Sequence, residues 1–150
     1  MANAIKYTSP SFTLGIAGDA SSPTLKNLAS GARILSTAIA TSRDEWSDWR
    51  LRVRLASAPA AGRQVRGWFI ADMGDQGAYE DGDASVEPFR QPDLVFAVRA
   101  VATQQVIVMR GVKKPNCAFK VLLLDDTGQA FTNTNDENQL HYSVYNDEIQ

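Results

Sequence analysis

The sequence contains one histidine, His141, and one cysteine, Cys117. Acid–base and nucleophilic catalysis mostly rely on such side chains, paired with a base or carboxylate in a pocket. No nucleophile-elbow motif precedes His141, and no basic or acidic residue clearly pairs with Cys117. Carboxylate pairs that hydrolyse glycosides meet only in space, and no pair on facing strands stands out. We therefore expect an ordinary strand residue at His141, a small buried apolar residue at Cys117, and no catalytic site.

Acidic residues gather in the stretch 74–92, where Asp81-Gly82-Asp83-Ala84-Ser85 places oxygen atoms at alternate positions. Ca²⁺ prefers about six to eight oxygen ligands and accepts loops of this kind. The stretch lacks the spacing of an EF-hand loop and its terminal bidentate glutamate. A solvated surface loop is the favoured interpretation, with a calcium site as the alternative. No metal or other cofactor is expected.

Arg50, Arg52 and Arg54 alternate with apolar residues in the stretch 49–55. Proteins that bind single-stranded nucleic acid combine basic and aromatic residues in this way. However, the period of a strand turns Trp49 to the face opposite the arginines, and the net charge of −2 does not attract phosphate. The arginine row is expected to face carboxylates on this protein or a neighbour, and no nucleic-acid partner is expected.

Composition and length indicate one soluble domain. The chain has 150 residues, of which 44% are hydrophobic and 21% charged, as is common for a globular domain with one core. Residues 1–10 lack the apolar region of a secretory leader, and no apolar run is long enough to span a bilayer. We expect synthesis in the cytoplasm and no membrane partner.

Short apolar runs that end in turn residues recur along the chain, which predicts strands. The clearest is 49–55, where apolar and charged residues alternate without a break. Almost no amphipathic helix is visible, so the sequence predicts an all-β domain, a jelly roll or β-sandwich of about eight antiparallel strands. The predicted strands are 12–17, 33–41, 49–55, 63–73, 94–102, 105–112, 118–125 and 140–145.

Turns and long connections separate the predicted strands. The Pro- and Gly-containing turn at 58–62 predicts a hairpin between 49–55 and 63–73. Residues 25–29 are predicted as a helical turn or an edge strand. Residues 1–24 are predicted as an N-terminal arm or edge segment, and 25–150 as the sandwich domain. Long connections often carry function, so 74–92 and 128–139 are the first candidates for contact sites.

Five parts of the sequence, in chain order, form a characteristic succession of turns, strands and loop elements. They are the small-residue approach Leu28-Ala29-Ser30-Gly31-Ala32-Arg33, the strand 46–55 with its turn 58–62, the run Trp68-Phe69-Ile70-Ala71-Asp72, the loop element Tyr79-Glu80-Asp81-Gly82, and the late segments Lys114-Pro115, Phe119 to Leu124 and Asp125-Asp126-Thr127-Gly128-Gln129-Ala130. This series, which covers most of residues 25–147, resembles a group of small bacteriophage virion proteins with a jelly-roll domain. It departs from their pattern at Asn116-Cys117-Ala118, where an aromatic residue is expected soon after Pro115.

The resemblance implies a non-catalytic structural protein at the capsid surface of the virion, of the decoration or cement type, or a related head or tail accessory. It implies the major capsid protein or other virion proteins as partners, and a homo-oligomer, with a trimer favoured. No catalytic residues are carried over from such proteins.

The residues themselves indicate candidate interfaces. Trp68 and Ile70 are predicted to form an apolar seam between copies. The other candidates are the arginine row Arg50, Arg52 and Arg54, together with Tyr79 and Phe89 of the acidic connection. The alternative function is a carbohydrate- or receptor-binding β-sandwich module of a phage tail, with Tyr79, Phe89 or Trp46 as sugar platforms.

Overall fold

The computed structural model describes residues 13–16, 24–40, 45–74, 85–134 and 136–145. These residues form eight strands and no helix. None of them forms a helix of the length and apolarity needed to cross a membrane. The strands are β1 (Thr13–Ile16), β2 (Arg33–Leu35), β3 (Trp46–Val53), β4 (Gln64–Ala71), β5 (Leu94–Ala97), β6 (Gln105–Lys113), β7 (Phe119–Asp126) and β8 (Gln139–Tyr145).

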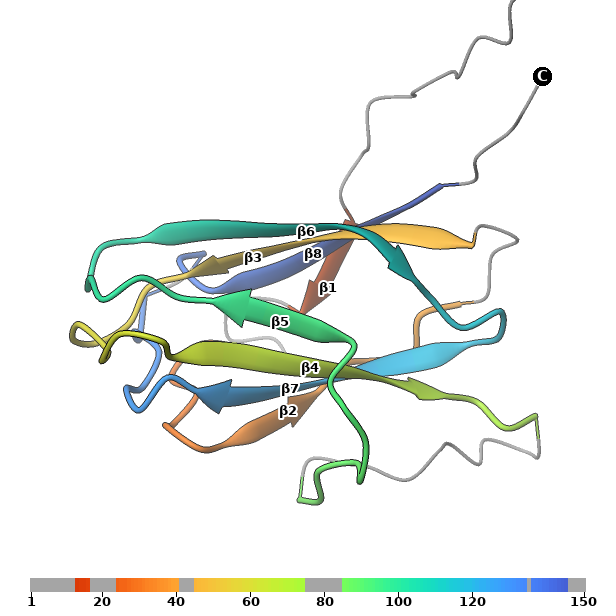
Figure 1. Cartoon of the computed structure of the whole chain (residues 1–150), viewed down its shortest axis with the longest axis horizontal. Helices are drawn as coiled ribbons and strands as arrows, with labels where there is room; N and C mark the ends of the chain where they lie inside the picture. Colours follow the sequence, from red (N-terminus) through yellow and green to blue (C-terminus); the bar gives the residue numbers. More distant parts are fainter. Residues whose placement is uncertain (1–12, 17–23, 41–44, 75–84, 135, 146–150) are drawn as a thin grey trace, which may run out of the picture.

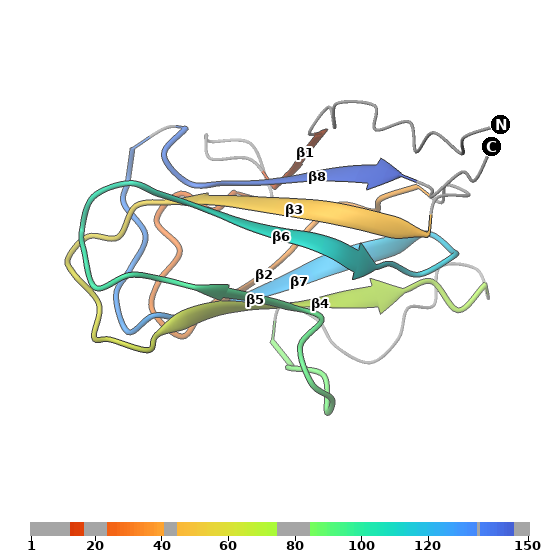
Figure 2. The same cartoon turned by 45° about the horizontal axis from the view of Figure 1, so that its top comes forward.

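Two four-stranded sheets pack face to face (Figures 1 and 2). Sheet I has the strand order β1-β8-β3-β6, and sheet II has the order β2-β7-β4-β5. Every strand pair is antiparallel. The prediction of an all-β sandwich with about eight antiparallel strands is therefore confirmed.

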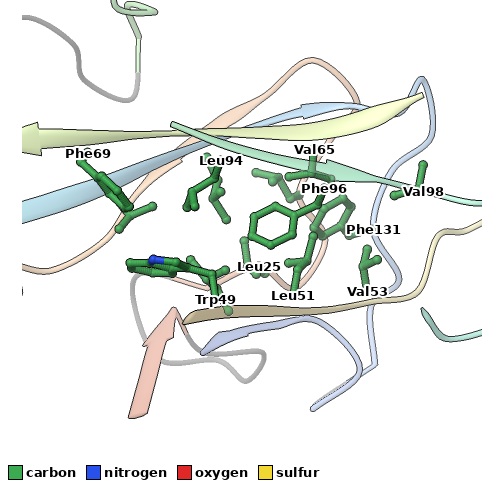
Figure 3. Close-up of a cluster of buried hydrophobic side chains, with 14 of the residues drawn as sticks. Leu25, Trp49, Leu51, Val53, Val65, Phe69, Leu94, Phe96, Val98 and Phe131 are labelled. Atoms are coloured by element: carbon green, nitrogen blue, oxygen red, sulfur yellow. The ribbon is translucent and has the colours of Figure 1, made fainter. Parts of the chain in front are cut away.

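Alternation along the strands sends one face of each sheet into a common core (Figure 3). Trp49, Leu51 and Val53 enter it from β3 and are fully buried, as their alternation with arginines predicts. The ring of Trp49 lies 5.3 Å from that of Phe69 on β4, and Phe69 lies 5.3 Å from the ring of Phe119 on β7. The Trp49–Phe69 contact joins the two sheets, and the Phe69–Phe119 contact links two neighbouring strands of sheet II.

The predicted hairpin between 49–55 and 63–73 is wrong, because β3 and β4 lie in different sheets. Just beyond β3, Leu55 forms a β-bridge with Phe131, and the N–H of Ala56 donates to the carbonyl of Ala130. These contacts hold the chain beside the 130–132 segment before it crosses to sheet II. Alternation and turn residues do not specify which sheet the next strand joins.

β2 is shorter than the predicted strand 33–41 because a side chain enters its ladder. The hydroxyl of Ser36 accepts a hydrogen bond from the N–H of Val121 at 2.8 Å and donates to the next carbonyl. The chain then leaves the sheet and returns only at Ile39, which forms an isolated bridge with Phe119. Serine competes for backbone partners in this way at strand ends.

β5 is likewise shorter than the predicted strand 94–102. The buried amide of Gln105 accepts from the N–H of Arg99 and donates to the carbonyls of Arg99 and Val101. These three bonds satisfy the backbone of the turn between β5 and β6. The turn is therefore fixed by a residue of the following strand.

Of the two alternatives for residues 1–24, an arm or an edge segment, the described part matches the edge segment. Residues 13–16 form β1, which is an edge strand of sheet I paired with β8. Residues 25–29 form a hydrogen-bonded turn with Asn27 at a φ of 60°, so they are neither a helical turn nor an edge strand. Leu25 and Leu28 of this turn are buried and belong to the core.

Candidate interaction surfaces

The outer face of sheet II carries a second apolar cluster. Trp68 and Ile70 of β4 lie there with Leu122 and Leu124 of β7, and all four are at most 5% exposed. An outer sheet face is buried in this way only when another part of the chain covers it. The structure corrects the prediction of an exposed Trp68–Ile70 seam, because neither side chain has accessible surface.

The β4–β5 connection lies over this face through its segment 85–93 (Figure 1). The indole N–H of Trp68 donates to the carbonyl of Arg90 at 3.0 Å. The Arg90 guanidinium donates to the carbonyl of Phe69 and, at 2.7 Å, to the carboxylate of Asp93. That carboxylate also accepts the N–H of Phe69 at 2.8 Å. We call these four residues the Arg90 clamp.

Ion pairs tie the same segment to two strands. The Glu87 carboxylate lies 3.1 Å from a guanidinium nitrogen of Arg66 on β4 and 3.5 Å from one of Arg33 on β2. Arg66 also lies 3.6 Å from the carboxylate of Asp126 and over the ring of Trp68. Each partly exposed pair contributes little by itself. Together, these ion pairs give the charged side chains beside the clamp partners of opposite charge within the same chain.

Phe89 stands between Glu87 and Arg90 with its side chain entirely exposed, at 105% of the reference area. Burying a phenylalanine side chain stabilises by roughly 1.5–3 kcal/mol, and this chain leaves that contribution unused. The backbone on both sides is held: Pro88 is buried, and Arg90 belongs to the clamp. The ring therefore projects from a fixed segment.

The arginine row lies on the outer face of sheet I. Strand register places Arg50 between His141 and Val108, and Arg52 between Gln139 and Val106. The carbonyl of Asp136 accepts a hydrogen bond from Arg52. Arg54, beyond β3, forms an ion pair with Glu137 at 2.5 Å. For Arg54, the predicted carboxylate partner thus lies within this protein.

His141 has surroundings unlike those of a catalytic histidine. Its Nδ1 is buried and has no hydrogen-bond partner in the described part of the chain. Burial, together with the charges of Arg50 and Arg52, lowers the pKa of His141 below its usual value. The ring faces cations, whereas a catalytic triad orients its imidazole with a carboxylate.

The remaining predicted residues lie apart. Tyr79 and the acidic element 81–83 fall outside the described residues, so the structure does not place them. Trp46 is half-buried at the start of β3. Cys117 is also half-buried, not fully buried as expected. Within the described ranges, no three His, Cys, Asp or Glu residues are arranged to hold a metal ion.

Sequence reasoning missed the Arg90 clamp. Its members are spread over β4 and the following connection, and their bonds depend on how that connection folds back. One signal was available: Arg90 and Asp93 have opposite charges three residues apart, with Pro88 and Pro92 close by in the sequence. No protein-family model, curated protein or solved structure matches this chain.

Proposed function

We propose that this protein is a non-catalytic structural component of a bacteriophage particle, which binds and stabilises the capsid surface as a decoration, cement or head accessory protein. The observation that carries this proposal is Phe89, a fully exposed aromatic side chain on a segment held by the Arg90 clamp. Aromatic residues of this kind are common anchors of protein–protein interfaces.

The strand pairing supports the proposal, because we interpret the sandwich as a jelly roll. The first strand pairs with the last, the second with the seventh, the third with the sixth, and the fourth with the fifth. Rolling one long antiparallel hairpin into two sheets produces this set of pairs. Jelly rolls occur in viral capsid proteins and also in lectins.

The energetics of a lattice also support it. A clamped segment loses little conformational freedom when Phe89 enters a partner, so more of the burial energy contributes to affinity. A shell repeats the same site many times, and any linkage between copies strengthens binding through effective concentration. A moderate contact per copy is then sufficient for stable decoration.

The second candidate is a carbohydrate-binding module, and an exposed aromatic ring such as Phe89 is the observation that favours it. Sugar hydroxyls also need free polar groups beside the ring. Here the charged groups beside the ring already have partners within the chain. Glu87 forms ion pairs with two arginines, and Arg90 and Asp93 are bonded to each other. A glycan array and a calcium titration separate the two functions, since a capsid-binding protein gives neither signal.

The direct test follows the chain through gradient purification of particles from a culture that produces it. We expect the protein in the particle fraction at a fixed ratio to the major capsid protein, measured by quantitative mass spectrometry. Recovery only with free proteins at the top of the gradient contradicts the proposal. Electron microscopy of particles with and without the chain then distinguishes head from tail placement.

A further inference from the structure

The two sheets have four edge strands, and β6 differs from the other three in length. β1, β2 and β5 have four, three and four residues, whereas β6 has nine. β6 pairs with β3 along one side, and within the described residues no strand pairs with its other side. Short edges are protected by their length, but a long edge offers a row of backbone donors and acceptors.

β6 also lacks the usual protection in its first half. Its residues 106–109 are Val-Ile-Val-Met, without a charge or a proline. Val106 and Val108 are 56% and 43% exposed on the outer face. One bulge is present, at Gly111, where φ is 64° and the N–H donates to the Asp48 carboxylate. It lies near the end of the strand and leaves 105–109 regular.

We infer that β6 pairs with β6 of a second copy of this chain, antiparallel and about a two-fold axis at Ile107. In this register Val106 faces Val108 of the second copy, so the four exposed valines of the dimer meet in two cross-strand pairs. Such pairs are the usual stabilising unit of a sheet. The two sheets I become one continuous sheet of eight strands.

The distribution of charge favours this orientation and this partner. Arg110 and Lys113 lie in the second half of β6, whereas the strand begins at uncharged Gln105, directly after uncharged Gln104. Antiparallel pairing about Ile107 places Arg110 opposite Gln104 of the second copy, whereas parallel pairing aligns cations with cations. Two chains of identical sequence therefore pair without facing like charges.

The arginine row is compatible with the same interface. Val108 lies beside Arg50, and Val106 beside Arg52, on the shared outer face. Across the dimer, Arg50 and Arg52 of the second copy are separated by three strand spacings, roughly 14 Å. This exceeds the Debye length of about 8 Å at physiological ionic strength, so their repulsion is largely screened. The valines thus keep the two arginine rows apart.

A two-fold interface of this kind makes a dimer, and a trimer needs a different contact. The seam lies on β6, not at the buried Trp68–Ile70 pair. The inference is independent of the proposed function: it holds or fails whether or not the protein binds a particle.

The test measures the molar mass of the full chain by size-exclusion chromatography with light scattering, over a range of micromolar concentrations. We expect twice the chain mass of 16.4 kDa for the wild type. The double variant V106K/V108K places lysines opposite lysines, so its dimer dissociation constant should rise on the order of 100-fold. Both sites are exposed, and circular dichroism confirms that the variant folds.

V86K is the matched control, because Val86 is 51% exposed but lies on the β4–β5 connection, away from β6. Its mass should equal that of the wild type. Hydrogen exchange of the β6 amides adds a second readout, with slower exchange in the wild-type dimer than in V106K/V108K. A monomeric wild type, an open series of larger species, or a V106K/V108K variant that stays dimeric overturns the inference.

Discussion

The outer faces of the two sheets differ in whether their apolar side chains are buried. On sheet II, Trp68 and its apolar neighbours are buried, and the indole of Trp68 is hydrogen-bonded to Arg90 of the β4–β5 connection. On sheet I, Val106 and Val108 stay exposed beside the arginine row. Both faces start from strands that alternate between inward and outward residues. The difference shows that an apolar outer position indicates either a second core or a contact surface, and that the period of the strand does not decide which.

The largest expected effect concerns the covered face. Trp68→Ala removes a fully buried indole and its bond to Arg90, so we expect a loss of roughly 3–5 kcal/mol in the free energy of unfolding. Arg52→Ala is the counterpart on the open face and should cost less than about 1 kcal/mol. Urea denaturation of both variants measures the difference. Similar small losses for the two would show that the outer face of sheet II is not a second core.

The next effect distinguishes the inner and outer sides of sheet II at the end of β7. Asp125 is fully buried, and desolvation raises its pKa to about 6, whereas its neighbour Asp126 pairs with arginines on the outer side. A folded pKa above the unfolded value means that the protonated carboxyl favours folding. This stabilisation is complete below about pH 4 and is lost as the pH rises through 6, by about 3 kcal/mol.

Asp125→Asn tests this assignment, because its amide oxygen still accepts the hydrogen bonds of Thr127 without carrying a charge. The free energy of unfolding of this variant should vary less between pH 4 and 7 than that of the wild type, and it should be higher at pH 7. Asp126→Asn is the control and should leave the rise toward low pH in place. An unchanged pH profile in Asp125→Asn would assign the effect to another group.

A smaller loss of stability is expected when the Arg90 clamp, which is present on sheet II alone, is weakened. Arg90→Ala removes hydrogen bonds to Phe69 and Asp93, and because Arg90 is partly exposed we expect a loss of about 1–2 kcal/mol. Amides of 85–93 should exchange faster, and limited proteolysis should begin there. Arg110→Ala, on the open face of sheet I, is the control. Unchanged exchange in 85–93 would mean that other contacts hold the connection.

The smallest effect on stability is expected at Phe89. Its ring is entirely exposed, so Phe89→Ala should change the free energy of unfolding by less than about 0.5 kcal/mol. Thermal and urea denaturation measure it. A loss of several times this size would mean that the ring packs on the chain's own surface. Phe89 would then be a buried residue of sheet II's outer face and not an exposed one.

Much of the sandwich was predictable because its strands follow a two-residue period. Each predicted strand has a counterpart, and the inward direction of Trp49, Leu51 and Val53 follows from their alternation with arginines. Local side-chain bonds were harder to foresee. Ser36 ends β2 early through a hydrogen bond to Val121, which only the folded chain brings near, and Gln105 ends β5 early through hydrogen bonds to the backbone of the turn before it.

The surfaces were less predictable than the core. The two-residue period of β4 places Trp68 and Ile70 on the face opposite Phe69, but it does not tell whether that face is exposed or covered. The exposure of Phe89 depends on where the connection 85–93 lies. The crossing between β3 and β4 was missed for a related reason, since sheet membership is decided by partners distant in the sequence.

The central claim is that Phe89 is a preset anchor for the capsid surface. Its most direct test is a binding isotherm of wild-type and Phe89→Ala protein on particles that lack the chain. We expect saturable binding of the wild type and binding at least tenfold weaker for the variant, which corresponds to about 1.4 kcal/mol, with the fold intact. Equal binding of both proteins would contradict the role of Phe89, and no binding of the wild type would contradict the proposed function itself.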